Sequence, residues 1–217
     1  MKKTITICFS LTALLLTLAT TATAQDYEPV GVQTNVSKST VFDGGWIECY
    51  TDLYATDGVS LVSILDQCQG ERMMLACSQV AGNEFVVLGQ ALYADVTFDT
   101  GTGNTTNEAN DIEWYYDESS SWGFAPLGET VSRTSCDTNS SQAEQRLCWH
   151  TNTDEIDGGW RCGTSTGLND STDWVRHILI NGEVPEAAPV PVNNFYLLAL
   201  LTLLLSGFGY IAIRRHR

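Results

Sequence analysis

Basic side chains are scarce in this 217-residue sequence. It contains 11 Lys and Arg against 26 Asp and Glu, and five of the basic residues lie in the first three and last four positions. All the acidic residues fall between Asp26 and Glu186, so that part of the chain has six basic residues and a net charge of −20. Such a surface repels phosphate backbones, which argues against nucleic-acid binding. It is compatible with solubility outside a cell and with the recruitment of divalent cations.

Histidine and the familiar catalytic motifs are also nearly absent. Only His150 and His177 lie outside the C-terminal end, and the chain has neither a G-x-S-x-G elbow nor a P-loop. His177 lies in an apolar, strand-like segment, where a satisfied core or edge histidine is expected. His150 neighbours Cys148, which cannot act as a thiolate nucleophile if it forms a disulfide. We therefore expect no catalysis, with a secreted hydrolase of unrecognised type as the alternative.

No stretch between the two ends of the chain shows a convincing helical stripe. Short β-type segments instead recur about every ten residues, separated by Gly, Asn, Asp and Ser, as is typical of an all-β sandwich. This pattern predicts a single, sandwich-like β domain over residues 41–180, preceded by a polar lead-in segment over 25–40. Residues 61–68 fit a short helix and a buried strand equally well. The expected strands are 41–50, 72–77, 84–88, 91–98, 112–116, 122–125, 131–136, 146–151, 159–162 and 174–180.

Six cysteines lie outside the N-terminal segment, and an even number in an exported chain predicts disulfides. Sequence alone leaves 15 connectivities open. The spacing does not fit zinc, because there is no CxxC and Cys148 lies too close to His150 for the usual ligand pattern. The six are Cys49, Cys68, Cys77, Cys136, Cys148 and Cys162.

The N-terminal residues have the three parts of a secretory signal peptide. Lys2 and Lys3 precede a largely apolar stretch over 5–18, and an A-x-A site ends at Ala24. We expect cleavage between Ala24 and Gln25 and export across the inner membrane. The signal peptide would then be residues 1–24.

The C-terminal residues contain a linker, an apolar run and a basic end. Residues 181–194 contain three prolines, which favour extended backbone. Residues 195–213 are uncharged and, at 19 residues, close to the ~20 that a helix needs to cross a bilayer. This run predicts a transmembrane helix with the membrane as its partner. The basic cytoplasmic end is residues 214–217.

Val190, Pro191, Val192, Asn193 and Asn194, followed by the apolar run and the basic end, resemble the bacterial sorting signals that exosortases process. The resemblance covers about 30 residues and is nearest to the variants that begin with Ile-Pro-Thr-Leu or Val-Pro. It departs from them where Phe and Tyr replace the usual Trp-Gly. It implies a membrane-anchored precursor, cleavage by a sorting protease, and a cell-surface or extracellular destination. A plain single-pass anchor is the alternative.

Residues 44–180 are similar to exported bacterial domains of unknown function.

Residues 99–111 form a loop with several oxygen-bearing side chains, of the kind that calcium binds. The loop lacks the bidentate Glu of an EF-hand, so the alternative is a polar loop without a metal. No other cofactor is expected. The calcium candidates are Asp99, Asn104, Asn107 and Asp111.

Aromatic residues suggest a contact surface for carbohydrate or another protein, since Trp and Tyr combine an apolar face with a polar group. Trp114, Tyr115 and Tyr116 are consecutive, and side chains alternate along a strand, so at least one of them should lie at the surface or a rim. The sequence therefore predicts a cell-surface or extracellular binding or matrix protein.

Overall fold

The computed structural model describes residues 26–182, and within this range strands dominate. The predicted all-β class is confirmed. No helix within these residues is both long and apolar enough to span a bilayer. The signal peptide and its cleavage site, the sorting motif, the apolar run over 195–213 and the basic end all lie outside the described residues.

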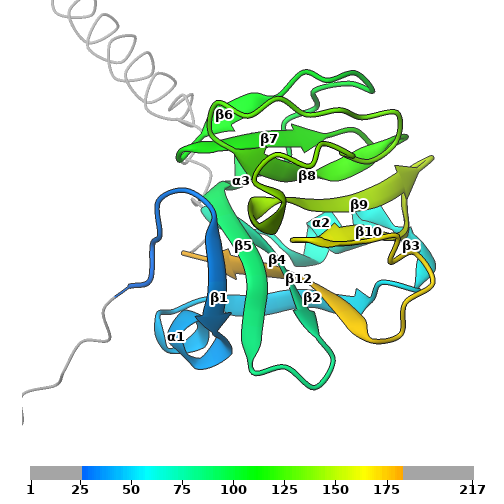
Figure 1. Ribbon diagram of the computed structural model, residues 1–217. Coiled ribbons are helices and arrows are strands. Elements are labelled where there is room, and N and C mark those ends of the chain that lie inside the picture. Colours follow the sequence, from blue (N-terminus) through cyan, green and yellow to red (C-terminus); the bar gives the residue numbers. More distant parts are fainter. Residues whose placement is uncertain (1–25, 183–217) are drawn as a thin grey trace, which may run out of the picture.

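Twelve strands form two antiparallel sheets (Figure 1). The first sheet has the order β1-β5-β4-β12-β2, and the second has the order β11-β10-β9-β8-β7-β6, with β3 paired to β10. The first contains β1 (Gln33–Ser37), β2 (Ile47–Leu53), β4 (Arg72–Gln79), β5 (Glu84–Leu92) and β12 (Trp174–Asn181). The second contains β3 (Asp57–Ser60), β6 (Asn107–Ala109), β7 (Ile112–Tyr116), β8 (Ser121–Pro126), β9 (Leu147–Asn152), β10 (Glu155–Cys162) and β11 (Ser165–Thr166).

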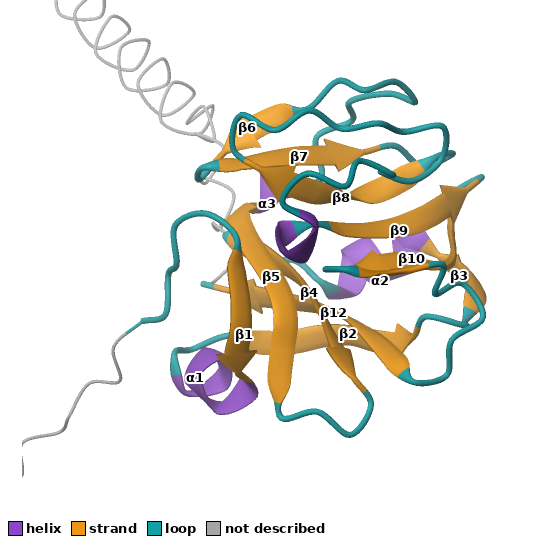
Figure 2. Ribbon diagram, in the orientation of Figure 1, coloured by secondary structure: helices purple, strands orange, loops and turns teal. Residues whose placement is uncertain are grey.

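Within residues 26–182, helices are few and short (Figure 2). They are α1 (Lys38–Asp43), α2 (Leu61–Gln67), α3 (Tyr93–Val96) and the 3-10 helix η1 (Ala143–Gln145). The ambiguous stretch 61–68 is therefore helical. Ser60 caps it, because its Oγ accepts a hydrogen bond from Ser63 N at 3.3 Å, and its apolar side with Leu61 and Ile64 is buried.

The main core lies between the two sheets and is rich in aromatic rings. Trp114 packs edge-on against Phe124 with ring centroids 5.2 Å apart, and Trp122 packs against Trp149 at 5.8 Å. All four are buried. Complete burial of a large apolar side chain contributes about 1.5–3 kcal/mol, so each of these four rings adds appreciably to the stability of the fold.

Each sheet is also covered on its outer face. On the first sheet, Val41 of α1 and Trp46 pack over Met74 and Phe85. On the second sheet, residues 127–146 cover a small apolar cluster that includes Tyr115. The central strands are therefore buried on both faces, and all six residues of β8 are inaccessible.

Three disulfides form, and the sequence prediction of disulfide bonding is confirmed. Cys49–Cys68 joins β2 to the end of α2, with sulfur atoms 2.07 Å apart. Cys77–Cys162 connects the two sheets at 2.02 Å, and Cys136–Cys148 ties the covering segment to β9 at 2.03 Å. The pairing is thus one specific member of the 15 alternatives.

Several elements differ from those expected. The expected strand 41–50 begins only at Ile47, because residues 38–43 form α1 and a turn follows it. The lead-in segment 25–40 contains β1, which pairs with β5 at the sheet edge, where a polar strand is tolerated because one side faces solvent. The expected strand 91–98 ends at Leu92, since Tyr93 N bonds to Glu71 O and the chain turns into α3. The segment 131–136 has no strand, because Asp137 Oδ1 takes the Ser132 N–H.

Candidate functional site

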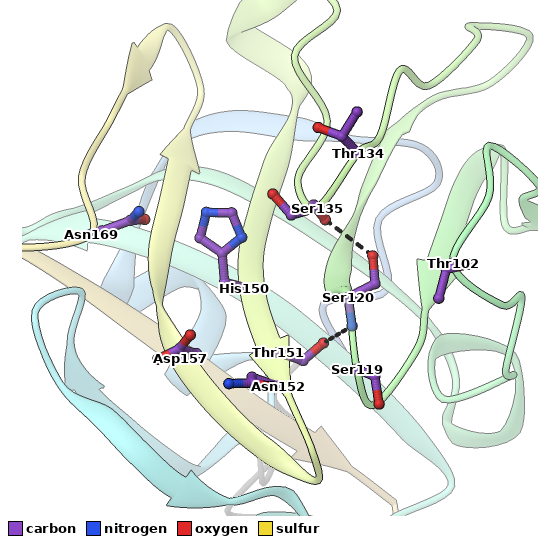
Figure 3. Close-up of a pocket in the computed structure, with 10 residues that line it drawn as sticks. All are labelled: Thr102, Ser119, Ser120, Thr134, Ser135, His150, Thr151, Asn152, Asp157 and Asn169. Atoms are coloured by element: carbon purple, nitrogen blue, oxygen red, sulfur yellow. Dashed lines mark hydrogen bonds between the residues drawn. The ribbon is translucent and has the colours of Figure 1, made fainter.

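A polar groove runs along the outer face of the second sheet (Figure 3). It has a volume of about 400 Å³, and a smaller hollow of about 200 Å³ shares Thr134, Ser135 and His150 with it. We call both parts together the His150 groove. Its lining residues are Thr102, Ser119, Ser120, Thr134, Ser135, Cys136, Thr138, His150, Thr151, Asn152, Asp157, Trp160 and Asn169.

The walls of the His150 groove come from separate chain segments that hydrogen bonds hold together. Ser120 N donates to Thr151 Oγ1 at 3.0 Å, and Ser120 Oγ donates to Ser135 O at 3.4 Å (Figure 3). Thr151 Oγ1 in turn donates to Asp117 O at 2.5 Å. The turn before β8, the covering segment and β9 are therefore fixed relative to one another.

Irregular pairing of β10 brings Asp157 and Trp160 to the same groove. Residues three apart on a regular strand point to opposite faces. The register between β9 and β10 shifts on both sides of Gly159, as at a β-bulge, which re-aims side chains. Glycine is required here, because a Cβ on Gly159 would lie 2.0 Å from the Tyr54 ring.

His150 and Trp160 form an aromatic wall in the groove. Their ring centroids are 6.0 Å apart, at an interplanar angle of 57°. Burial lowers the pKa of His150 from its usual 6.5, and the nearby Asp157 carboxylate opposes part of that change. His150 is therefore a neutral ring at pH 7.

Two polar atoms at the groove lack partners among the described residues. Trp160 Nε1 and Asn169 Oδ1 are both inaccessible, and neither forms a hydrogen bond within residues 26–182. Buried donors and acceptors are paired in the great majority of cases, to protein or to water. An indole donor and an amide acceptor next to the groove are thus left without a protein partner in the described part of the chain, but their burial keeps them from direct contact with a molecule in the groove.

A cluster of buried charges fixes the chain segment that forms one wall of the groove. Asp137 Oδ2 accepts from Arg146 Nη1 at 2.6 Å and lies 3.8 Å from Arg161 Nη1. Arg146 also pairs with Glu129 at 2.9 Å. The Cys136–Cys148 disulfide lies beside this cluster, so the segment bearing Thr134 and Ser135 is held to β9 both covalently and electrostatically.

Arg133 donates hydrogen bonds to backbone oxygens of the loop 99–111, which contains the calcium candidates. Its guanidinium donates to Gly103 O at 2.7 Å and Gly101 O at 2.8 Å, and its own N–H donates to Asn104 Oδ1 at 2.7 Å. The guanidinium also stacks on the Tyr115 ring, 4.6 Å from the centroid. A side-chain cation thus provides the positive charge inside this loop.

The remaining calcium candidates have separate roles. Asp99 Oδ1 accepts from Gly101 N at 2.8 Å, and Asn107 Nδ2 donates to Asp95 O at 3.1 Å. Asp111 lies in the β6–β7 turn with a φ of 57°. Within residues 26–182, no three His, Cys, Asp or Glu side chains are grouped to hold a metal.

The three consecutive aromatic residues lie in different surroundings, and one of them, Tyr116, is partly exposed, as alternation along the strand predicts. Trp114 points into the core between the sheets, and Tyr115 is buried on the opposite face, where its hydroxyl donates to Leu147 O at 2.9 Å. Tyr115 is buried because residues 127–146 cover a face that alternation alone would leave open. Only Tyr116 is partly exposed, and it packs against Trp122 at 5.3 Å.

The first sheet carries a hydrogen-bonded relay in the order found in serine hydrolases. Ser78 Oγ lies 2.8 Å from His177 Nε2, and His177 Nδ1 lies 2.5 Å from Glu48 Oε1. Ser78 is fully buried, however, so a substrate carbonyl cannot reach its hydroxyl. The relay satisfies a buried histidine, as expected for His177 from the sequence.

Sequence reasoning missed the His150 groove. The sequence contains two GGW motifs, at 44–46 and 158–160. Only the second, Gly158-Gly159-Trp160, contributes to the groove; in the first, Trp46 Nε1 donates to Tyr27 O at 2.6 Å on the other sheet. No protein-family model, curated protein or solved structure matches this chain.

Proposed function

We propose that this chain is an exported cell-surface or extracellular binding protein that holds a saccharide in the His150 groove, without catalysis. The observation that carries the proposal is the groove itself, in which short hydroxyl and amide side chains line an aromatic wall. Binding sites typically combine such a surface with a few well-placed polar groups.

The chemistry of the lining suits a sugar. Serine and threonine hydroxyls both donate and accept, as sugar hydroxyls do, and an indole face offers an apolar surface with a polar N–H at its edge. The lining amides of Asn152 and Asn169 belong to side chains that can each donate and accept. An alternating set of donors and acceptors is what a polyhydroxylated ring requires.

A hydrolase is the second candidate, because His150 and Asp157 lie in the same groove. Binding is favoured, since His150 forms no hydrogen bond to a serine or threonine hydroxyl within the described residues, and a general base needs its nucleophile within reach. Turnover of a bound saccharide that His150→Ala abolishes would favour the hydrolase.

Export and sorting belong to the same proposal. The signal-like residues 1–24 and the sorting-like tail would deliver the domain to the cell surface, and three disulfides suit an oxidising compartment. Mass spectrometry of the native product tests the sorting step. A product that ends near Pro191 supports it, whereas one that retains Arg217 supports a plain anchor.

The binding proposal can be tested on a glycan array with the full chain in a detergent that contains no sugar. Trp160→Leu keeps an apolar side chain but removes the aromatic ring that lines the groove, and we expect about a 5-fold weaker affinity for the best saccharide, as for one lost aromatic contact. Trp46→Leu is the matched control, because it removes the ring of the other GGW motif, whose indole donates to Tyr27 O outside the groove. Equal losses in both variants, or no bound saccharide, would contradict the proposal.

A further inference from the structure

We propose that the His150 groove selects saccharides that carry free ammonium groups over neutral and acidic ones. This inference rests on the saccharide-binding function proposed above and names the class of ligand. The charges around the groove carry it.

Negative charge lies in the groove and in the turns next to it. Asp157 is an exposed carboxylate in its lining. Glu118 directly precedes the lining residue Ser119, and its backbone oxygen accepts from Asp154 N at 3.2 Å, so the β9–β10 turn lies beside it. A hydrogen bond to Asp154 and the charge of that carboxylate raise the pKa of Glu118, as expected where like charges are crowded together.

Three arginines lie near the second sheet, but their guanidinium groups form contacts inside the protein and not with the groove. Arg146 is fully buried and paired with Asp137 and Glu129, and Arg161 donates to Asn139 O at 2.6 Å. Arg133 donates to the loop carbonyls. Their donors are therefore used inside the protein.

The aromatic wall adds no compensating cation. His150 is neutral at pH 7 because burial lowers its pKa. The basic side chains in residues 26–182 number six against a large acidic excess, so the long-range field has the same sign as the local one. A uronate or sulfated sugar would be repelled, and an ammonium group attracted.

The test compares the affinities of the full chain for three tetrasaccharides by calorimetry at about pH 7, where His150 is neutral, carboxylates are ionised and sugar amines are protonated in large part. The probes are a glucosamine tetramer, its N-acetylated counterpart and a galacturonate tetramer. We expect the glucosamine tetramer to bind about 5-fold more tightly than the acetylated one, as for an exposed ion pair at the upper end of its range, and the galacturonate to bind most weakly.

Asp157→Asn should remove most of that preference, and Glu84→Gln, an exposed acid at the start of β5 on the other sheet, is the control. Raising the salt from 0.05 to 0.5 M should also narrow the preference in the unmodified chain, through screening, which tests the inference without any variant.

Equal affinities for the glucosamine and acetylated tetramers would overturn this inference and leave saccharide binding standing. Failure of every saccharide to bind would overturn the proposed function as well. An oligolysine peptide that binds as tightly as the glucosamine tetramer would overturn the saccharide class in favour of a cationic peptide.

Discussion

Asp137 is the buried carboxylate around which residues 127–146 are arranged. Its Oδ1 accepts from Ser132 N at 2.9 Å and from Asn139 N at 3.0 Å, while Oδ2 accepts from Arg146. Arg146 and Asp137 are both fully inaccessible. Charges this deep are tolerated only when each is paired and hydrogen-bonded.

Replacing Asp137 with Asn should therefore destabilise the protein strongly. The amide keeps the shape but leaves Arg146 and Arg161 without their anion, and breaking a buried pair costs about 3–5 kcal/mol. Urea unfolding would measure the loss. Glu129→Gln is the comparison, and it should have a far smaller effect because Glu129 is partly exposed; similar losses would contradict the assigned role of Asp137.

His150 should make the stability of the protein depend on pH. Burial places its folded pKa below 6.5, so as the pH falls through 6.5 the unfolded state takes up the proton first and gains stability relative to the folded state. The stability that the folded state owes to the neutral form of His150 is fully present above pH 6.5 and is lost as the pH falls below 6.5. Melting temperatures at pH 7.5 and 5.5 should differ less in His150→Gln than in the unmodified chain, and an unchanged difference would refute this.

At the scale of elements, the loop between α3 and β6 owes its conformation to a residue far away in the sequence. Arg133 reaches it from the covering segment and donates to two of its carbonyls, although some 30 positions separate them. Loops of this kind otherwise carry few internal contacts and open easily.

Arg133→Met should free this loop without unfolding the sheets. Hydrogen exchange at residues 99–107 should become at least about 10-fold faster, since a loss of roughly 1.4 kcal/mol in local stability already has that effect. The strands β4 and β5 should stay protected. Arg72→Met, which removes one hydrogen bond to Gln90 on the other sheet, should leave the exchange of the loop unchanged.

For the molecule as a whole, the two sheets are joined by their shared core and by one covalent link between them. Cys77 lies on β4 of the first sheet and Cys162 on β10 of the second, 85 residues apart. Cys136 and Cys148 are 12 residues apart and act within the second sheet and its cover. The longer loop restricts the unfolded chain more.

Removing Cys77–Cys162 by double Ala substitution should accordingly cost more than removing Cys136–Cys148. The chain-entropy estimate is about 4.5 kcal/mol for the first and about 3 kcal/mol for the second. Chemical unfolding of both double variants would compare them. The reverse order would show that native packing around the shorter bridge, rather than loop length, decides its contribution.

Several strands could be predicted because their signal is local. Residues 72–77, 84–88, 112–116 and 174–180 were each expected and each lie within an observed strand. The local signal failed where the partners are distant in sequence. The strand β1 is too polar to show a strand pattern, although it pairs with β5. In residues 131–136, the Ser132 N–H donates to the Asp137 side chain instead of a neighbouring strand.

The candidate site could not be predicted, since its parts come from six regions of the chain between Thr102 and Asn169. No local pattern marks Thr134, Ser135 or Asn169 as neighbours of His150. The one local hint was the Gly pair before Trp160, whose meaning depends on the Tyr54 ring against which Gly159 packs.

The sequence by itself determined the β class, the acidic charge and the use of six cysteines, because composition, alternation and parity act without knowledge of contacts. Only the tertiary structure decided which cysteines pair, which face of β7 is covered, and that Arg133 fills the loop where calcium was considered. These outcomes depend on side chains that meet across long sequence separations, where packing and the pairing of buried charges, rather than local preference, set the lowest free energy.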